Sequence, residues 1–150
     1  MGRRSATPVR FEQAVGERLA AYVAAHPGSS LSAAANRLVD EGLRTVEHPG
    51  VVFRDGPTGR RAGLVGGPDV WEIVRALKSA RAAEPEAAEE DVLGIAASNS
   101  GLPLRLVRTA VRYWACYPEE VDAEIDAAAT AEDTAEHAWQ RERQLLARQR

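Results

Sequence analysis

Arginine side chains occur at a spacing that could serve phosphate or base contacts. Arg105, Arg108 and Arg112 fall at i, i+3 and i+7, so a helix through them would carry three guanidinium groups on one face. A guanidinium group is planar, always charged and able to donate paired hydrogen bonds to phosphate oxygens or to a guanine edge. One interpretation is therefore a DNA-contacting helix. The alternative is a solvated face, or one paired with the acidic run at residues 118–124.

Side chains that could do covalent or metal chemistry form no such pattern. The three histidines and the single cysteine, Cys116, are not spaced as a zinc site, and no nucleophile falls beside a base and an orienting group. Aromatic residues surround Cys116 in the sequence, which predicts a buried structural thiol. We expect no enzyme, no metal site and no cofactor.

The charge of the chain is unevenly distributed. Residues 1–81 carry twelve Lys and Arg against eight Asp and Glu, whereas residues 82–150 carry seven against fourteen. Contact with phosphate depends on the local field within about a Debye length, roughly 8 Å at physiological salt. The net charge of −3 therefore does not exclude double-stranded DNA as a partner.

The sequence predicts a strand at residues 7–11, followed by helices at 12–25 and 31–46. A five-residue strand alone leaves its backbone groups unpaired, and antiparallel pairing of two copies would satisfy them. Alternation along the strand predicts an inward row and an outward row. The inward row is Thr7, Val9 and Phe11, and the outward row is Ala6, Pro8 and Arg10.

The turn at residues 26–30 connects the two predicted helices. Pro27 and Gly28 stop the first helix, and Ser30 is a candidate N-cap of the second. The second helix carries an apolar stripe that includes Leu38 and Val39. We expect Val9, Phe11, Leu38 and Val39 to form the contacts of a homodimer.

This strand–helix–helix order resembles the ribbon-helix-helix family of antitoxins and repressors, often described as CopG-like. The resemblance covers about the first third of the chain. It implies that Arg10 is the main base reader, flanked by Ala6 and Pro8, with Arg3 and Arg4 nearby. It also implies that the helix start with Ser29, Ser30 and Ser32 clamps a DNA phosphate. Pro8 departs from the family, which usually carries a polar side chain there.

A second module begins after the Pro-Gly turn at residues 49–50. Residues 51–54 and 61–65 read as a β-hairpin whose turn is residues 55–60, and Asp69 with Glu72 forms the capping box of a helix reaching about Ala80. Residues 91–98 and 103–117, separated by a Gly-containing break, form a helix-turn-helix pattern. Pro103 fits the first position of the second helix.

Residues 48–125 also resemble an uncharacterised small domain of prokaryotic antitoxins, including some VapB-type antitoxins paired with PIN-like ribonuclease toxins. The resemblance rests on His-Pro-Gly, a Val-Phe-Arg strand, a Val-Trp-Glu-Ile-Val helix and the ending Tyr-Pro-Glu-Glu-Val. It implies a helix-turn-helix-like module and, by association, a toxin partner. It assigns no site residue.

The last part of the chain, residues 127–150, offers few large apolar groups. Trp139, Leu145 and Leu146 form a thin helical stripe that buries too little to offset the cost of ordering. We expect a partly helical tail, frayed unless it docks on a partner through these three residues. The alternative is a tail that packs on its own dimer or stays loose.

Together these patterns predict a mainly α protein with short β strands: a swapped-strand ribbon-helix-helix dimer over residues 1–46, a hairpin with a three- to four-helix bundle over 48–126, and the tail. No apolar run approaches a membrane span and no signal peptide is evident, so we expect a cytoplasmic protein. The expected function is sequence-specific DNA binding by a homodimer that represses transcription, with its own gene as the expected target. The alternative is an antitoxin that neutralises a PIN-like ribonuclease.

Overall fold

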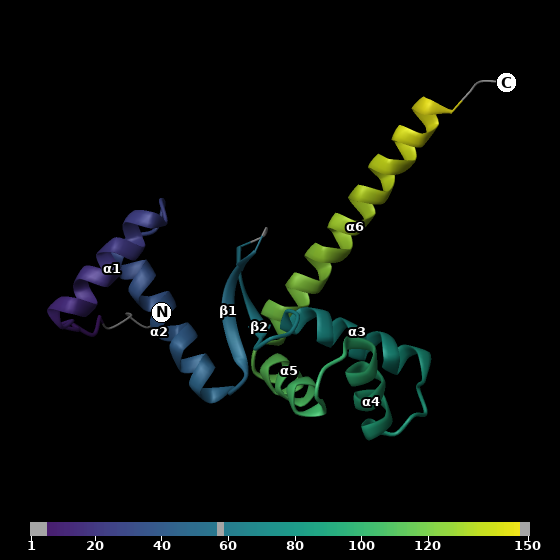
Figure 1. Ribbon diagram of the computed structural model, residues 1–150, viewed down its shortest axis with the longest axis horizontal. Coiled ribbons are helices and arrows are strands. Elements are labelled where there is room, and N and C mark those ends of the chain that lie inside the picture. Colours follow the sequence, from purple (N-terminus) through teal and green to yellow (C-terminus); the bar gives the residue numbers. More distant parts are fainter. Residues whose placement is uncertain (1–5, 57–58, 148–150) are drawn as a thin grey trace. The chain divides into compact units, whose positions relative to one another are not determined.

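A computed structural model of the chain describes residues 6–56 and 59–147. The chain divides into two compact units, residues 1–44 (unit 1) and residues 45–150 (unit 2), which are described separately. The described residues are mainly helical, as the composition predicts (Figure 1). Their elements are α1 Gln13–Ala25, α2 Leu31–Glu47, β1 Val51–Gly56, β2 Gly59–Leu64, α3 Val70–Ala83, α4 Glu89–Ser100, α5 Leu104–Cys116 and α6 Pro118–Leu146.

Unit 1 consists of α1 and most of α2, and their bounds agree with the predicted helices within one residue. Among the hydrophobic side chains of residues 6–44, the buried ones are Leu19 and Ala34. Residues 6–12, which include the predicted strand, are not part of a strand within this single chain. Pairing of this segment between two copies stays a prediction.

Unit 2 begins with the hairpin of β1 and β2. The strands are antiparallel and pair from Val51 opposite Leu64 to Gly56 opposite Gly59. The predicted turn at residues 55–60 is therefore too long, because pairing continues through Asp55 and Arg60, whose side chains also form an ion pair at 3.5 Å.

The core of unit 2 lies between the hairpin and α3, α4 and α5. The apolar stripes of α3 (Val70, Ile73, Val74 and Leu77) and of α5 (Leu106, Val107, Ala110, Val111 and Trp114) are buried or partly buried, and Tyr113 is fully enclosed. Gly101 ends α4 in the left-handed conformation (φ 66°), which a glycine adopts without strain. Pro103 is the N-cap of α5 rather than its first helical residue, one position earlier than predicted.

Helix α6 begins at Pro118 and continues without a break to Leu146, so the expected frayed tail is the second half of a 29-residue helix. Its first turns pack on α3 and α5 through Val121 and Ile125. The remainder extends beyond the other helices of the unit (Figure 1). Alanine-rich sequence with neither glycine nor an internal proline favours this continuity. Within residues 6–56 and 59–147, no helix is long and apolar enough to cross a membrane.

Candidate nucleic-acid interface

The start of α2 has the geometry of a capped helix. The N–H of Ala33 donates a hydrogen bond to Oγ of Ser30 at 3.1 Å, which confirms Ser30 as the N-cap. Gly28 has a φ of 91°, which allows the tight turn from α1. Ser30 and Ser32 are exposed and Ser29 is half-buried. The first N–H groups of a helix have no intrahelical acceptor, so this end of α2 can bind an anion such as a DNA phosphate.

The connection between α1 and α2 is fixed by an aromatic pair and an arginine. The rings of Tyr22 and His26 stack with centroids 4.0 Å apart, and Nδ1 of His26 lies 2.8 Å from the carbonyl oxygen of Tyr22. Nη2 of Arg37 donates to the Tyr22 hydroxyl at 2.8 Å. These contacts bind α2 to the end of α1 and so fix the direction in which the serine-rich turn points. These contacts could not be predicted from the sequence, because residues 22 and 37 meet only when the two helices pack together.

The N-terminal segment, residues 6–11, lies exposed beside α2. Thr7, Val9 and Phe11, the predicted inward row, all line hollows on unit 1, whereas Pro8 and Arg10 line neither. Within the single chain, the two predicted rows thus differ in which residues line these hollows, and the alternation along a paired strand stays a prediction. Ala6 is the exception, since it lines one hollow although it was assigned to the outward row.

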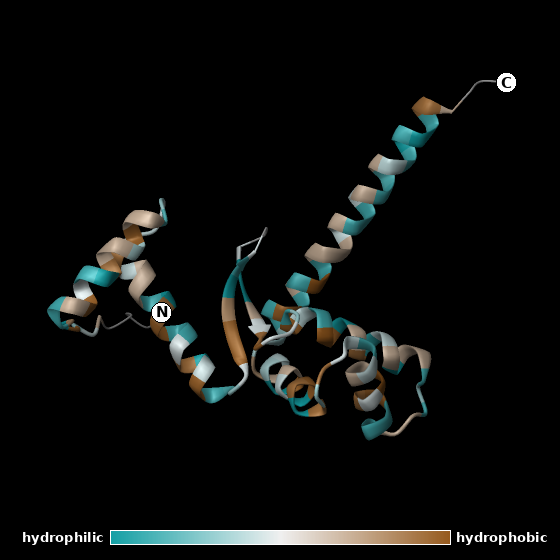
Figure 2. Cartoon of the chain, in the orientation of Figure 1, coloured by the Kyte–Doolittle hydropathy of each residue, from teal (hydrophilic) through white to brown (hydrophobic). Residues whose placement is uncertain are grey.

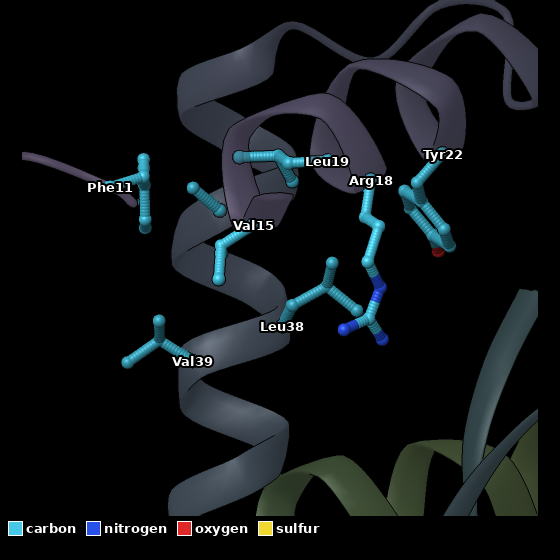
Figure 3. Close-up of a pocket in the computed structure, with 8 residues that line it drawn as sticks. Phe11, Val15, Arg18, Leu19, Tyr22, Leu38 and Val39 are labelled. Atoms are coloured by element: carbon cyan, nitrogen blue, oxygen red, sulfur yellow. The ribbon is translucent and has the colours of Figure 1, made fainter. Parts of the chain in front are cut away.

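Two shallow hollows lie on the apolar face of unit 1. The first, of about 360 Å³, is formed mainly by α1 and α2, and Figure 3 shows Phe11, Val15 and Leu38 around one shared space. The second, of about 530 Å³, is lined by the N-terminal segment and α2. Val9 is 66% exposed and Val39, which lines both hollows, is 56% exposed. Apolar side chains left this open mark a surface suited to a protein partner.

The second candidate face is on α5. Arg105 and Arg112 are exposed, as the spacing predicted. Arg108 is half-buried and forms an ion pair with Glu90 at the start of α4. The acidic run at residues 118–124 was an alternative partner for these arginines, but its Asp122 instead accepts from Nζ of Lys78 at 2.7 Å and from the indole N–H of Trp114 at 3.0 Å.

The predicted partner-binding residues lie on the distal half of α6. Trp139 is 57% exposed, Leu145 is 84% exposed, and Leu146 is also exposed. The guanidinium of Arg143 lies over the Trp139 ring, 5.3 Å from its centroid. Figure 2 shows hydrophilic and mildly hydrophobic residues alternating along this half of the helix, with a hydrophobic patch at its end. The side chains of all three residues are therefore exposed on a helix.

The remaining predictions concern the N-terminal arginines, the cysteine and metal binding. Arg3 and Arg4 lie outside the described residues. Cys116 is exposed, so the prediction of a buried thiol is wrong. Cys116 and its neighbour Ala115 lie on the exposed face of the last turn of α5, whereas Tyr113, Trp114 and Tyr117 pack in or against the core. Within the described part of the chain, no group of three or more His, Cys, Asp or Glu side chains could hold a metal ion.

A charged network in unit 2 was found only in the structure. Asp69, buried at the start of α3, lies 3.1 Å from Nε of Arg54 and 2.9 Å from Nε of Arg61, while its N–H donates to Glu72 at 2.8 Å. The sequence identified Asp69 and Glu72 as a capping box, which is confirmed. It did not identify the arginines, because their approach depends on the hairpin register.

Two carboxyl groups near the start of α6 have shifted pKa values. Hydrogen bonds from Lys78 and Trp114 lower the pKa of Asp122. Burial, together with the negative charge of neighbouring carboxylates, raises the pKa of Glu124 to about 7. The neutral form of Glu124 is thus more stable than that of an ordinary glutamate, and the sequence around residue 124 does not indicate this.

Comparison with known proteins gave no match to this chain. No protein-family model, no curated protein and no solved structure is similar enough to show a relationship.

Proposed function

We propose that the protein is a homodimeric, sequence-specific DNA-binding regulator of transcription that represses its own promoter. In this proposal the N-terminal segments of two copies pair as an antiparallel ribbon in the major groove, with Arg10 reading base edges and the Ser30-capped start of α2 holding a phosphate. The observation that carries it is the apolar face of unit 1. Val9, Phe11 and Val39 remain exposed there, and a second copy of the same face would cover them.

The arrangement of the N-terminal segment also favours this proposal. Thr7, Val9 and Phe11 line the hollows that a second copy would fill, whereas Pro8 and Arg10 line neither. A two-stranded ribbon is narrow enough to enter the major groove, and a guanidinium group can donate two hydrogen bonds to guanine. Two ribbon strands, each with a capped helix behind it, would supply both base contacts and phosphate contacts.

The test is a fluorescence-anisotropy titration with labelled duplex DNA from immediately upstream of the gene. It is run near physiological salt with excess unlabelled competitor DNA, because non-specific affinity falls steeply as salt rises. Binding in the nanomolar range that resists competitor supports the proposal, since specific sites are typically bound at about 10⁻⁸ M or tighter. Binding that competitor abolishes, with the same affinity for shuffled DNA, contradicts it.

A second candidate function rests on the distal half of α6. We propose as the alternative that the chain is an antitoxin whose α6 binds and neutralises a PIN-like ribonuclease, with DNA binding as autoregulation. Trp139, Leu145 and Leu146 would be the apolar anchors of that helix. Co-expression with an adjacent PIN-like open reading frame tests this: protection by the full chain but not by residues 1–132 supports it, and equal protection by both contradicts it.

A further inference from the structure

The start of α6 places a carboxyl group in a position that does not suit a charge. Glu124 lies in the second turn of α6, and its Oε2 is buried without a hydrogen-bond partner among the described residues. A buried ionised oxygen without a donor loses its hydration and gains nothing in exchange. A protonated carboxyl group in the same place has a much smaller cost.

The charges around Glu124 come from each element that packs near it. Glu120 precedes it by one turn on α6, Asp69 begins α3, and Arg61 lies on β2. Arg61 favours the ionised form of Glu124, but it is also in an ion pair with Asp69, which binds Arg54 from β1 as well, so Glu124 shares this cation with another carboxylate.

Two ion pairs join α3 to α6 without involving Glu124. Nζ of Lys78 lies 2.7 Å from Asp122, and Nη1 of Arg75 lies 2.7 Å from Glu132. The charges that act on Glu124 are the carboxylates of Glu120 and Asp69, which disfavour its ionised form, and the guanidinium of Arg61, which favours it. A proton on Glu124 removes its repulsion with the two carboxylates.

We propose that Glu124 is a pH-sensitive latch that holds the first turns of α6 on the hairpin and the start of α3 when protonated and loosens them when ionised. The latch involves Glu124 on α6, Asp69 before α3 and Arg61 on β2. It operates near neutral pH, because burial and the neighbouring carboxylates raise the pKa of Glu124 to about 7. It acts on α6 as a whole, since side chains from residue 129 to residue 147 are exposed and the helix is joined to the rest of unit 2 through its first turns and the Arg75–Glu132 ion pair.

Hydrogen–deuterium exchange of the full chain tests the latch. Amide protection of the peptide covering residues 118–128 is measured at pH 6 and pH 8 and corrected for intrinsic exchange. We expect it to fall about tenfold over this range in the wild type, since one unit of pKa corresponds to a factor of ten. In Glu124→Gln the side chain is always neutral, so protection should change by less than about twofold. The matched control is Glu119→Gln on the exposed side of the same first turns, which should behave as the wild type.

A second measurement does not depend on any variant. Carbon-13 NMR of the wild-type Glu124 carboxyl group gives its titration midpoint directly. A midpoint near 7 supports the latch, whereas a midpoint near 4.5, the ordinary value for glutamate, overturns it. The latch is also overturned if Glu124→Gln shows the same pH-dependent loss of protection as the wild type.

Discussion

Oδ2 of Asp69 lies 2.9 Å from Nε of Arg61, which joins the start of α3 to β2. The other carboxylate oxygen lies 3.1 Å from Nε of Arg54 on β1. One buried carboxylate thus connects both strands of the hairpin to the first helix of the core. Nη2 of Arg54 also donates to the Gly67 carbonyl at 2.7 Å, which fixes the loop between β2 and α3.

Asp69→Asn should destabilise unit 2 substantially. The variant keeps the size of the side chain and its capping ability but leaves two arginines without their shared charge. Breaking a buried ion pair typically costs about 3 to 5 kcal/mol, and partial exposure of Arg54 reduces this to about 2 to 4 kcal/mol. Urea denaturation followed by tryptophan fluorescence measures the change in the free energy of unfolding.

The matched control is Asp55→Asn in the same hairpin. Asp55 is exposed and pairs with Arg60 at 3.5 Å, so its loss should change the free energy of unfolding by less than about 0.5 kcal/mol. Equal effects of the two substitutions would show that the Asp69 network adds no more stability than an exposed ion pair.

Val39→Glu should prevent association of unit 1. Val39 lines both hollows on the apolar face, and a charge there would have to be buried without a partner on dimerisation. The molar mass from light scattering should fall from that of a dimer to that of a monomer. Ala33→Glu, on an exposed position of α2 that lines neither hollow, should leave the mass unchanged. A dimeric Val39→Glu variant would place the interface elsewhere.

Arg10→Ala should remove specific DNA binding without unfolding the dimer. A bidentate contact from arginine to guanine is worth about 1 to 3 kcal/mol, and the dimer loses two of them, so affinity for the operator should fall by at least about thirtyfold. Arg10→Lys keeps the charge but not the paired donors, so it should retain non-specific affinity while losing discrimination between operator and shuffled DNA. Competition titrations separate the two effects, and wild-type affinity of Arg10→Ala would refute base reading by this residue.

The stability of the wild type should decrease between about pH 4.5 and pH 7. Glu124 has a pKa of about 7 in the folded protein and an ordinary value of 4.5, so in this window the folded state holds a proton that the unfolded state has released. With allowance for its partial exposure, Glu124 contributes about 1 to 2 kcal/mol to the pH-dependent change in the free energy of unfolding. Urea denaturation at pH 4.5, 6 and 8 measures it. In Glu124→Gln this part of the pH dependence should be absent; an unchanged profile would contradict the assignment.

Deletion of residues 133–150 should leave both units folded. Side chains from residue 129 to residue 147 are exposed, and ending the chain at Glu132 keeps the ion pair with Arg75. The melting temperature should change by less than about 2 °C, consistent with the small effect of removing exposed residues. Operator affinity should also be unchanged. A loss of DNA binding equal to that of Arg10→Ala would assign the distal half of α6 to DNA rather than to a protein partner.

Features set by local sequence were predictable. The bounds of α1 and α2, the cap at Ser30 and the capping box at Asp69 follow from residues within a few positions of each other. The buried stripes of α3 and α5 follow from helical periodicity. In each case the information lies within one or two turns of chain.

Features that depend on packing were not predictable. Arg54, Arg61 and Asp69 meet only in one register of the hairpin, and Tyr22 meets Arg37 only when two helices cross. The continuity of α6 was not predicted for a different reason. The small apolar area of its distal half suggested fraying, but the high helix propensity of alanine favours a continuous helix. Cys116 was misplaced because neighbouring aromatic residues were taken to share its environment.

The shortage of buried apolar surface in unit 1 has a consequence for the abundance of the protein. With Leu19 and Ala34 as its buried hydrophobic residues, a solitary copy of this unit gains little to oppose the entropy of the open chain. By mass action, the folded fraction of unit 1 must then rise with the concentration of the molecule that covers its apolar face. Newly made chains at low concentration would therefore be cleaved by proteases more readily than chains at high concentration. The lifetime of the protein would then depend on its rate of synthesis.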